Sequence, residues 1–158
     1  MSFVWRLTPP AYSHVLNGAG NRVTGARWNS PGRGVVYTCA NLSLCVLETY
    51  VHVPSPLRPA LPDFEAIRLF IPDDAGTAQI TMTELERLLA SPNPESACRA
   101  VGDRWLDTAA HLILAAPSIV VPEELNIILN PAHERMQEVA IMSTRRFRFD
   151  PRLATAQP

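Results

Sequence analysis

The chain has 158 residues, of which 47% are hydrophobic and 18% are charged, and its formal net charge is -1. This composition is too apolar for a disordered protein, so we expect a single domain over residues 1–158 with a core of about 3–153. With this net charge the protein has no overall positive field to neutralise phosphates, on which a nucleic-acid-binding protein relies. All 14 basic residues are arginine, which excludes a lysine nucleophile, a lysine Schiff base and a P-loop lysine.

The three cysteines are Cys39, Cys45 and Cys98, and none belongs to a C-x-x-C pair. We therefore expect neither a structural zinc site nor a disulfide framework. Arg6 interrupts the first apolar run, so no signal peptide is visible. The longest apolar stretch, residues 112–121, is far shorter than the roughly 20 residues of a membrane span. These features predict a soluble cytoplasmic protein that binds neither a membrane nor nucleic acid directly.

The first half of the chain predicts a strand, a loop, a strand and a helix. The loop, residues 17–34, is rich in Gly, Asn and Ser and suits a segment that wraps a ligand. Asn41 is a typical helix N-cap, and the apolar residues after it recur at near-helical spacing. The two strands are expected over residues 3–7 and 35–38, and a stiff proline-rich linker is expected over residues 54–62.

The second half predicts two helices and several strands. Thr83 and Glu86 fit a capping box that opens a helix ending near residue 91, and residues 96–110 are expected to form the next helix. The strands are expected over residues 64–71, near 79–80, and over 112–116, 119–121, 125–129, 138–142 and 145–149. The sum is a mixed α/β or α+β domain with most strands late in the chain.

Polar residues stand in confined settings in several short motifs. The motifs are Gly25-Ala26-Arg27-Trp28-Asn29, Leu47-Glu48-Thr49-Tyr50-Val51-His52, Ala116-Pro117-Ser118, the Leu125 to His133 segment, and Phe147 to Leu153. Their order resembles the RES domain, which is named for its Arg, Glu and Ser. The resemblance runs from about Trp5 to Leu153, nearly the whole chain.

This resemblance implies an ADP-ribosyltransferase-like fold, with a mixed, mainly antiparallel split sheet flanked by helices. It also implies a toxin that consumes NAD and is silenced by an antitoxin with an Xre-type helix-turn-helix that occludes the active site. By motif matching, Arg27, Glu48 and Ser118 are the expected catalytic residues. The expected NAD-binding residues are Arg6, Arg27, Tyr37 and Ser118, and no metal is expected.

The chemistry of NAD cleavage is consistent with these residue types. Nicotinamide leaves as a neutral molecule, so its departure needs no general acid, and Glu48 could stabilise the positive charge that grows on the ribose. Arg27, helped by Arg6, could grip the diphosphate, and Tyr37 could stack on a flat ring. Ser118 is interpreted as a hydrogen-bonding partner of the ribose or of Glu48, not as a nucleophile, because the chain has no G-x-S-x-G motif.

Three acceptors of the ADP-ribosyl group stay open: a protein, inorganic phosphate and water. Transfer to a host protein is favoured, because the sequence offers no evident water-activating base beside Glu48. His52 and His133 lack an i, i+4 histidine pair and are interpreted as structural. Alternatives are an NAD phosphorylase or glycohydrolase, a catalytically silent binding module and, with poor ligand spacing, a metal-dependent hydrolase. A homodimer is also compatible with the sequence.

Overall fold

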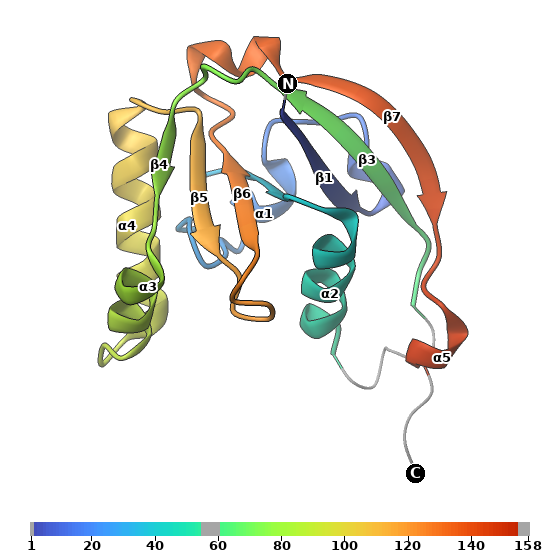
Figure 1. Ribbon diagram of the computed structural model, residues 1–158, viewed down its shortest axis with the longest axis horizontal. Helices are drawn as coiled ribbons and strands as arrows, with labels where there is room; N and C mark the ends of the chain where they lie inside the picture. Colours follow the sequence, from blue (N-terminus) through green and yellow to red (C-terminus); the bar gives the residue numbers. More distant parts are fainter. Residues whose placement is uncertain (1, 55–60, 155–158) are drawn as a thin grey trace.

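The computed structural model describes residues 2–54 and 61–154, which form a seven-stranded sheet with helices beside it (Figure 1). The strands are β1 (Ser2–Thr8), β2 (Val36–Cys39), β3 (Phe64–Ile71), β4 (Thr77–Gln79), β5 (Ile113–Pro117), β6 (Leu125–Leu129) and β7 (Ala140–Phe147). The helices are α1 (Ala19–Arg22), α2 (Leu42–His52), α3 (Met82–Leu89), α4 (Pro94–Thr108) and α5 (Pro151–Ala154), with short 3-10 turns at Pro10–Tyr12 and Glu134–Glu138.

The sheet has the strand order β4-β5-β6-β2-β1-β3-β7, and all neighbours are antiparallel except β4 and β5. Strands β1 and β2 share a single register pair, Trp5 with Cys39, so the sheet opens into two halves at this junction. Helix α2 lies beside the junction in Figure 1, and its Leu44 and Cys45 form a cluster with Cys39, against which Trp5 packs. The predicted split, mainly antiparallel sheet flanked by helices is confirmed.

Helices α3 and α4 cover one face of the β4-β5-β6-β2 half. The cluster beneath them consists of Trp28, Val35, Ile80, Leu85, Leu88, Cys98, Trp105, Leu114, Ala116 and Ile128. A second cluster contains apolar residues from both halves of the sheet: Val4, Val36, Ile67, Leu69, Ile71, Ala75, Leu112 and Leu129. Because this second cluster is continuous across the junction, the two halves share one core despite their weak backbone pairing.

Most of the predicted elements are present, but their ends differ where a different residue caps the helix. Asn41 caps α2 as predicted, with its Oδ1 accepting from the Leu44 N–H at 2.8 Å. Helix α3 begins two residues earlier than predicted, because Thr81 and not Thr83 accepts from the Glu84 N–H, at 3.2 Å. Asn93 caps α4 in the same way, and Pro94 follows as a residue with no N–H to satisfy.

Two predictions for the last strands are wrong. Residues 119–121 form no strand, because the Val120 and Val121 N–H groups donate to the Ser118 hydroxyl and turn the chain. The two strands predicted over 138–142 and 145–149 are one strand, β7, which pairs with β3 along its whole length and absorbs an irregularity between Arg68 and Leu69. The irregularity interrupts the regular alternation of side chains between the two faces of the sheet. The strand prediction from the sequence had relied on that alternation.

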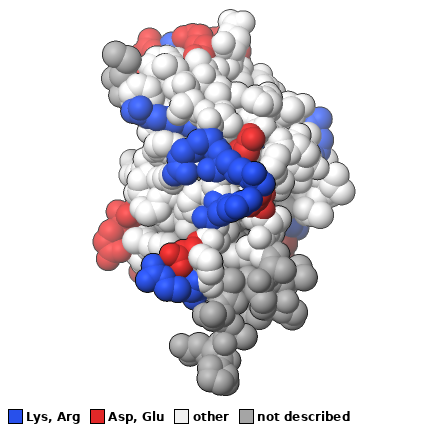
Figure 2. Space-filling model, turned by 90° about the vertical axis from the view of Figure 1, so that its right-hand side faces the viewer, with Lys and Arg blue, Asp and Glu red and all other residues white. Residues whose placement is uncertain are grey.

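Strand β7 forms one edge of the sheet, and arginine side chains gather on this side of the molecule (Figure 2). Arg146 and Arg148 both pair with Asp63, the residue before β3. Charged side chains on an edge strand discourage pairing with another chain.

The predicted proline-rich linker lies largely at residues 55–60, outside the described residues. Within the described part of the chain, no helix is long and apolar enough to cross a bilayer.

We predict that Gly102→Ala destabilises the protein, because α4 touches the loop before β2 at this glycine. A Cβ at Gly102 would lie 1.9 Å from the Trp28 carbonyl oxygen, so α4 or the loop must move. Such overpacking typically costs about 1–3 kcal/mol, measurable as a lower urea midpoint. Gly20→Ala is the matched control, since nothing lies within 4 Å of its added Cβ. Equal midpoints for the two variants would contradict this account.

Candidate active site

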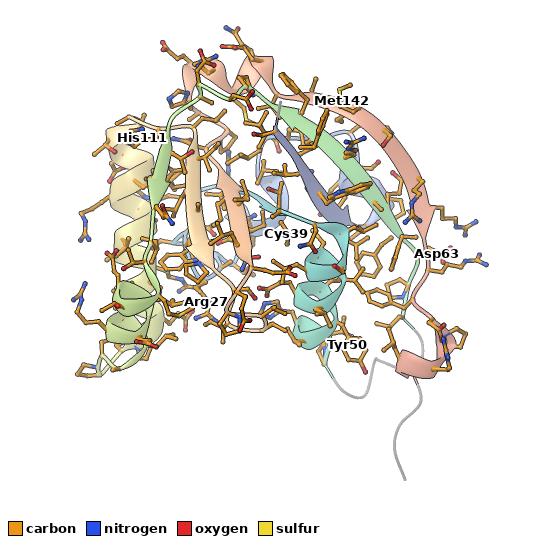
Figure 3. All side chains as sticks on the ribbon, in the orientation of Figure 1. Arg27, Cys39, Tyr50, Asp63, His111 and Met142 are labelled. Carbon is orange, nitrogen blue, oxygen red and sulfur yellow. The ribbon has the colours of Figure 1, made fainter. Side chains whose placement is uncertain are left out.

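A cavity of about 930 Å³ opens between α2, the start of α4 and the sheet end that carries β2 and β6. Its lining residues come from segments far apart in the sequence: Leu7, Thr24, Gly25, Ala26, Arg27, Trp28, Tyr37, Thr38, Cys39, Cys45, Glu48, Thr49, His52, Pro94, Glu95, Arg99 and Asn126. Figure 3 labels two of them, Arg27 and Cys39. Pockets that hold small molecules usually measure about 300–1,000 Å³, so this cavity has the size for a dinucleotide.

Glu48 presents a fixed carboxylate to the cavity. Its Oε1 accepts from the Ser118 hydroxyl and from the Asn126 side-chain amide, each at 2.8 Å. These donors come from the end of β5 and the start of β6, whereas Glu48 belongs to α2. Both contacts are on one oxygen, and Oε2 lies 3.9 Å from His52 Nε2. The carboxylate is thus held by one oxygen and offers the other to a ligand.

The hydroxyl of Ser118 is fully used within the protein. It donates to Glu48 Oε1 and accepts from the Val120 and Val121 N–H groups, both at 3.0 Å. A serine hydroxyl has one donor and two acceptor positions, and the residue is 0% exposed. Of the two roles that the sequence left open for Ser118, the structure shows the contact with Glu48, and Ser118 is not among the cavity-lining residues.

Arg27 lies at the tip of a tight turn. Ala26 and Asn29 form an isolated antiparallel bridge, with the Ala26 N–H donating to the Asn29 carbonyl at 3.0 Å. Trp28, next to Arg27 in this turn, is 2% exposed and belongs to the core under α3 and α4. Gly25 has φ +69°, and a Cβ there would lie 2.6 Å from the Asn29 carbonyl. The buried tryptophan therefore anchors the turn that places Arg27 at the cavity.

Helix α4 holds this turn from the other side. Arg99 donates from Nε to the Ala26 carbonyl at 3.1 Å and from its terminal nitrogen to the Thr24 carbonyl at 3.3 Å, and it pairs with Glu95 at 2.7 Å. Asp103 accepts from the backbone N–H and the hydroxyl of Ser30, at 3.0 and 2.6 Å. Packed supports of this kind keep a binding side chain in one geometry.

Tyr37 lines the cavity with its ring while its hydroxyl is occupied. The phenol oxygen accepts from the Trp28 N–H at 3.0 Å, and its O–H donates to Asn29 Oδ1 at 2.9 Å. Burial raises the pKa of the Tyr37 phenol well above its usual value, so the hydroxyl stays protonated. Tyr37 thus ties β2 to the Arg27 turn, and the ring face is what it can offer to a ligand.

Arg6 is not brought together with the other predicted residues. Its guanidinium donates to the Tyr12 and Val15 carbonyls, at 3.3 and 2.7 Å, and burial lowers the pKa of this group. Successive side chains of a strand point to opposite faces. Leu7, the next residue of β1, lines the cavity, whereas Arg6 does not, so Arg6 holds the turn after β1 in this structure.

Two residues at the carboxylate were not among the predicted site residues. Asn126 belongs to one of the sequence motifs but was not among the expected catalytic or NAD-binding residues, yet it lines the cavity and donates to Glu48. The Cys39 thiol lies 3.4 Å from Asn126 Oδ1, which leaves the amide nitrogen to face Glu48. His52 was also set aside, although its i, i+4 spacing from Glu48 on a predicted helix was a signal that the two share a face.

Comparisons with known proteins agree with this arrangement. The family model described as "RES domain" matches residues 3–150. A protein named "Prs ADP-ribosylating toxin" from Sphingobium sp. is 32% identical, with 94% of each chain covered. A "Toxin Res" from Photorhabdus laumondii is 31% identical over 98% of each chain. The fold is similar to a chain in the crystal structure of the M. tuberculosis MbcT-MbcA toxin-antitoxin complex, with a TM-score of 0.70, 17% identity and coverage of 97% of this chain and 86% of that one.

We predict that Ser118→Ala destabilises the fold, because the change removes a buried donor to Glu48 and the acceptor of two backbone N–H groups. Leaving buried polar groups without partners typically costs about 1–3 kcal/mol, measured by urea unfolding monitored with circular dichroism. Ser143→Ala, on the exposed surface of β7, is the control and should change little. Equal stabilities of the two variants would refute the anchoring role.

Proposed function

Because the chain belongs to the RES domain family, we propose that it is a toxin that breaks the nicotinamide-ribose bond of NAD and transfers the ADP-ribosyl group to an acceptor. The observation that carries this proposal is the carboxylate of Glu48, which is held through Oε1 by Ser118 and Asn126 and belongs to a residue that lines the same cavity as Arg27. A module that only binds a nucleotide has no need of a carboxylate fixed in this way.

Glu48 is proposed to act on the ribose. When the bond to nicotinamide opens, its electron pair leaves with the neutral base and positive charge grows on the ribose. A carboxylate that is already oriented stabilises this charge without reorganising at the moment of reaction. The two hydrogen bonds on Oε1 supply that orientation, and they leave Oε2 to accept from ribose hydroxyls.

Arg27 is proposed to bind the diphosphate. A guanidinium presents two parallel N–H groups that match phosphate oxygens, and the anchored turn fixes where Arg27 stands. The ring of Tyr37, whose hydroxyl is engaged within the protein, is available to pack against a planar group. Arg6 is left out of this proposed binding set, because its guanidinium is engaged with the Tyr12 and Val15 carbonyls.

We propose a host protein as the acceptor, which the name of the Sphingobium relative supports. Phosphorolysis or hydrolysis of NAD is the alternative, and the first experiment below distinguishes the three products. An antitoxin with an Xre-type helix-turn-helix is proposed to cover the cavity in the cytoplasm, since the structural neighbour comes from a toxin-antitoxin complex. Without such a partner the enzyme would attack the NAD of its own cell.

We predict that Glu48→Gln abolishes nicotinamide release while the protein stays folded. Gln keeps the shape of the side chain but removes the charge that opposes the growing cation. Loss of one such preorganised group typically lowers the rate about 10²–10³-fold. The measurement is free nicotinamide from NAD, with adenine-labelled NAD in cell extract to show whether label ends on a protein band, on ADP-ribose or on its phosphate.

The matched control is Glu86→Gln, which removes an exposed carboxylate of α3 that does not line the cavity and should retain full activity. Wild-type protein that binds NAD without releasing nicotinamide would indicate the silent binding module. Near-normal release by a folded Glu48→Gln protein would contradict the role of Glu48 and leave the cleavage itself to another group.

Arg27→Lys is predicted to weaken NAD binding, because lysine keeps the charge but loses the bidentate fork that matches a diphosphate. Titration calorimetry of the inactive Glu48→Gln background with NAD measures this without turnover. Arg104→Lys, on the exposed face of α4, provides the comparison and should bind like the parent. An unchanged affinity in Arg27→Lys would show that Arg27 does not clamp the phosphates.

A further inference from the structure

His52 stands beside the free oxygen of the catalytic carboxylate. It is the last residue of α2, one helical turn after Glu48, and its Nε2 lies 3.9 Å from Glu48 Oε2. The imidazole lines the same cavity and is 75% exposed, so a second molecule can reach it from solvent. Because Glu48 Oε1 is occupied by Ser118 and Asn126, the reactive side of the carboxylate is the side that faces His52.

An acceptor that attacks through a hydroxyl must lose a proton, and few groups in the cavity can take it. Arg27 and Arg99 carry guanidinium groups that stay protonated, and Glu95 is paired with Arg99. Hydrogen bonding to Cys45 and burial raise the pKa of the Cys39 thiol, and burial raises that of the Tyr37 phenol, so both remain neutral donors.

Two further groups are excluded by their contacts or role. The Cys45 thiol donates to the Trp5 carbonyl at 2.9 Å. Glu48 is needed as an anion beside the developing cation, and a proton on it would remove that charge. Among the described residues that line the cavity, His52 remains, and its Nε2 lies 3.9 Å from Glu48 Oε2, beside the position where the acceptor loses its proton.

We propose that His52 is the general base of the acceptor step and that the acceptor is a hydroxyl-bearing molecule. This inference rests on the proposed cleavage of NAD. The bond from the anomeric carbon to nicotinamide breaks and its electron pair leaves with nicotinamide. The acceptor oxygen forms the new bond to that carbon from the His52 side, and its proton moves to His52 Nε2 and from there to water.

The test uses an acceptor that has no proton to lose. NAD is offered to wild-type protein and to His52→Gln in plain buffer, where water is the acceptor, and in buffer with sodium azide. We expect ADP-ribose formation by His52→Gln to fall about 10²–10⁴-fold, the usual contribution of a positioned base. With azide, the variant and the wild type should form ADP-ribosyl azide at similar rates. His14→Gln, an exposed histidine outside the cavity lining, is the control and should behave as wild type in both buffers.

Two results would overturn the role of His52. Unchanged ADP-ribose formation by His52→Gln would show that no base is needed there. Failure of His52→Gln to form the azide product would show that His52 supports the cavity or the position of Glu48 instead. If the wild-type protein releases no nicotinamide in either buffer or in cell extract that supplies a host-protein acceptor, the proposed cleavage fails first, and this outcome is visible before any variant is compared.

Discussion

The hydrogen bonds that Glu48 accepts from Ser118 and Asn126 join the two parts of the molecule on which the site depends. Helix α2 follows β2, which pairs with β6, but it packs mainly against β1, beside the junction where β1 and β2 share only one register pair. The carboxylate of Glu48 reaches from α2 to the ends of β5 and β6 and adds two contacts of 2.8 Å to that half of the sheet. The interaction that orients the proposed catalytic carboxylate is thus also one that positions its helix.

The cationic end of the cavity is built by a different device, a loop locked by its own buried residues. Trp28 is buried in the core, and Gly102 allows α4 to contact the Trp28 carbonyl. Arg99 then holds the backbone of the same turn through the Ala26 and Thr24 carbonyls. The contacts that hold the Arg27 turn come from α4, whereas the hydrogen bonds that hold Glu48 come from the ends of β5 and β6. A substitution that disturbs one of these two sets of contacts can therefore leave the other set intact.

Most helices and strands, the family motifs and the candidate residues Arg27 and Glu48 could be predicted from the sequence, because each depends on a short stretch of neighbouring residues. It was insufficient where a contact depends on tertiary placement. The sequence did not show whether Arg6 or Leu7 faces the cavity, because that depends on which face of the sheet α2 covers. The burial of Ser118 follows from two backbone N–H groups that turn the chain after β5, in a segment that sequence pattern assigned to a strand.

The two carboxylate oxygens of Glu48 have different contacts and different proposed roles. Oε1 accepts the two hydrogen bonds that orient the carboxylate, whereas Oε2 lies 3.9 Å from Nε2 of His52, a residue that lines the cavity. A carboxylate whose oxygens were both hydrogen-bonded by the protein would be well ordered but closed to the ribose. One with neither bonded would reach the ribose from many directions and lose the benefit of preorganisation. This asymmetry allows one side chain to be rigid and accessible at the same time. In the proposed reaction it places the acceptor on the side where the His52 imidazole lies.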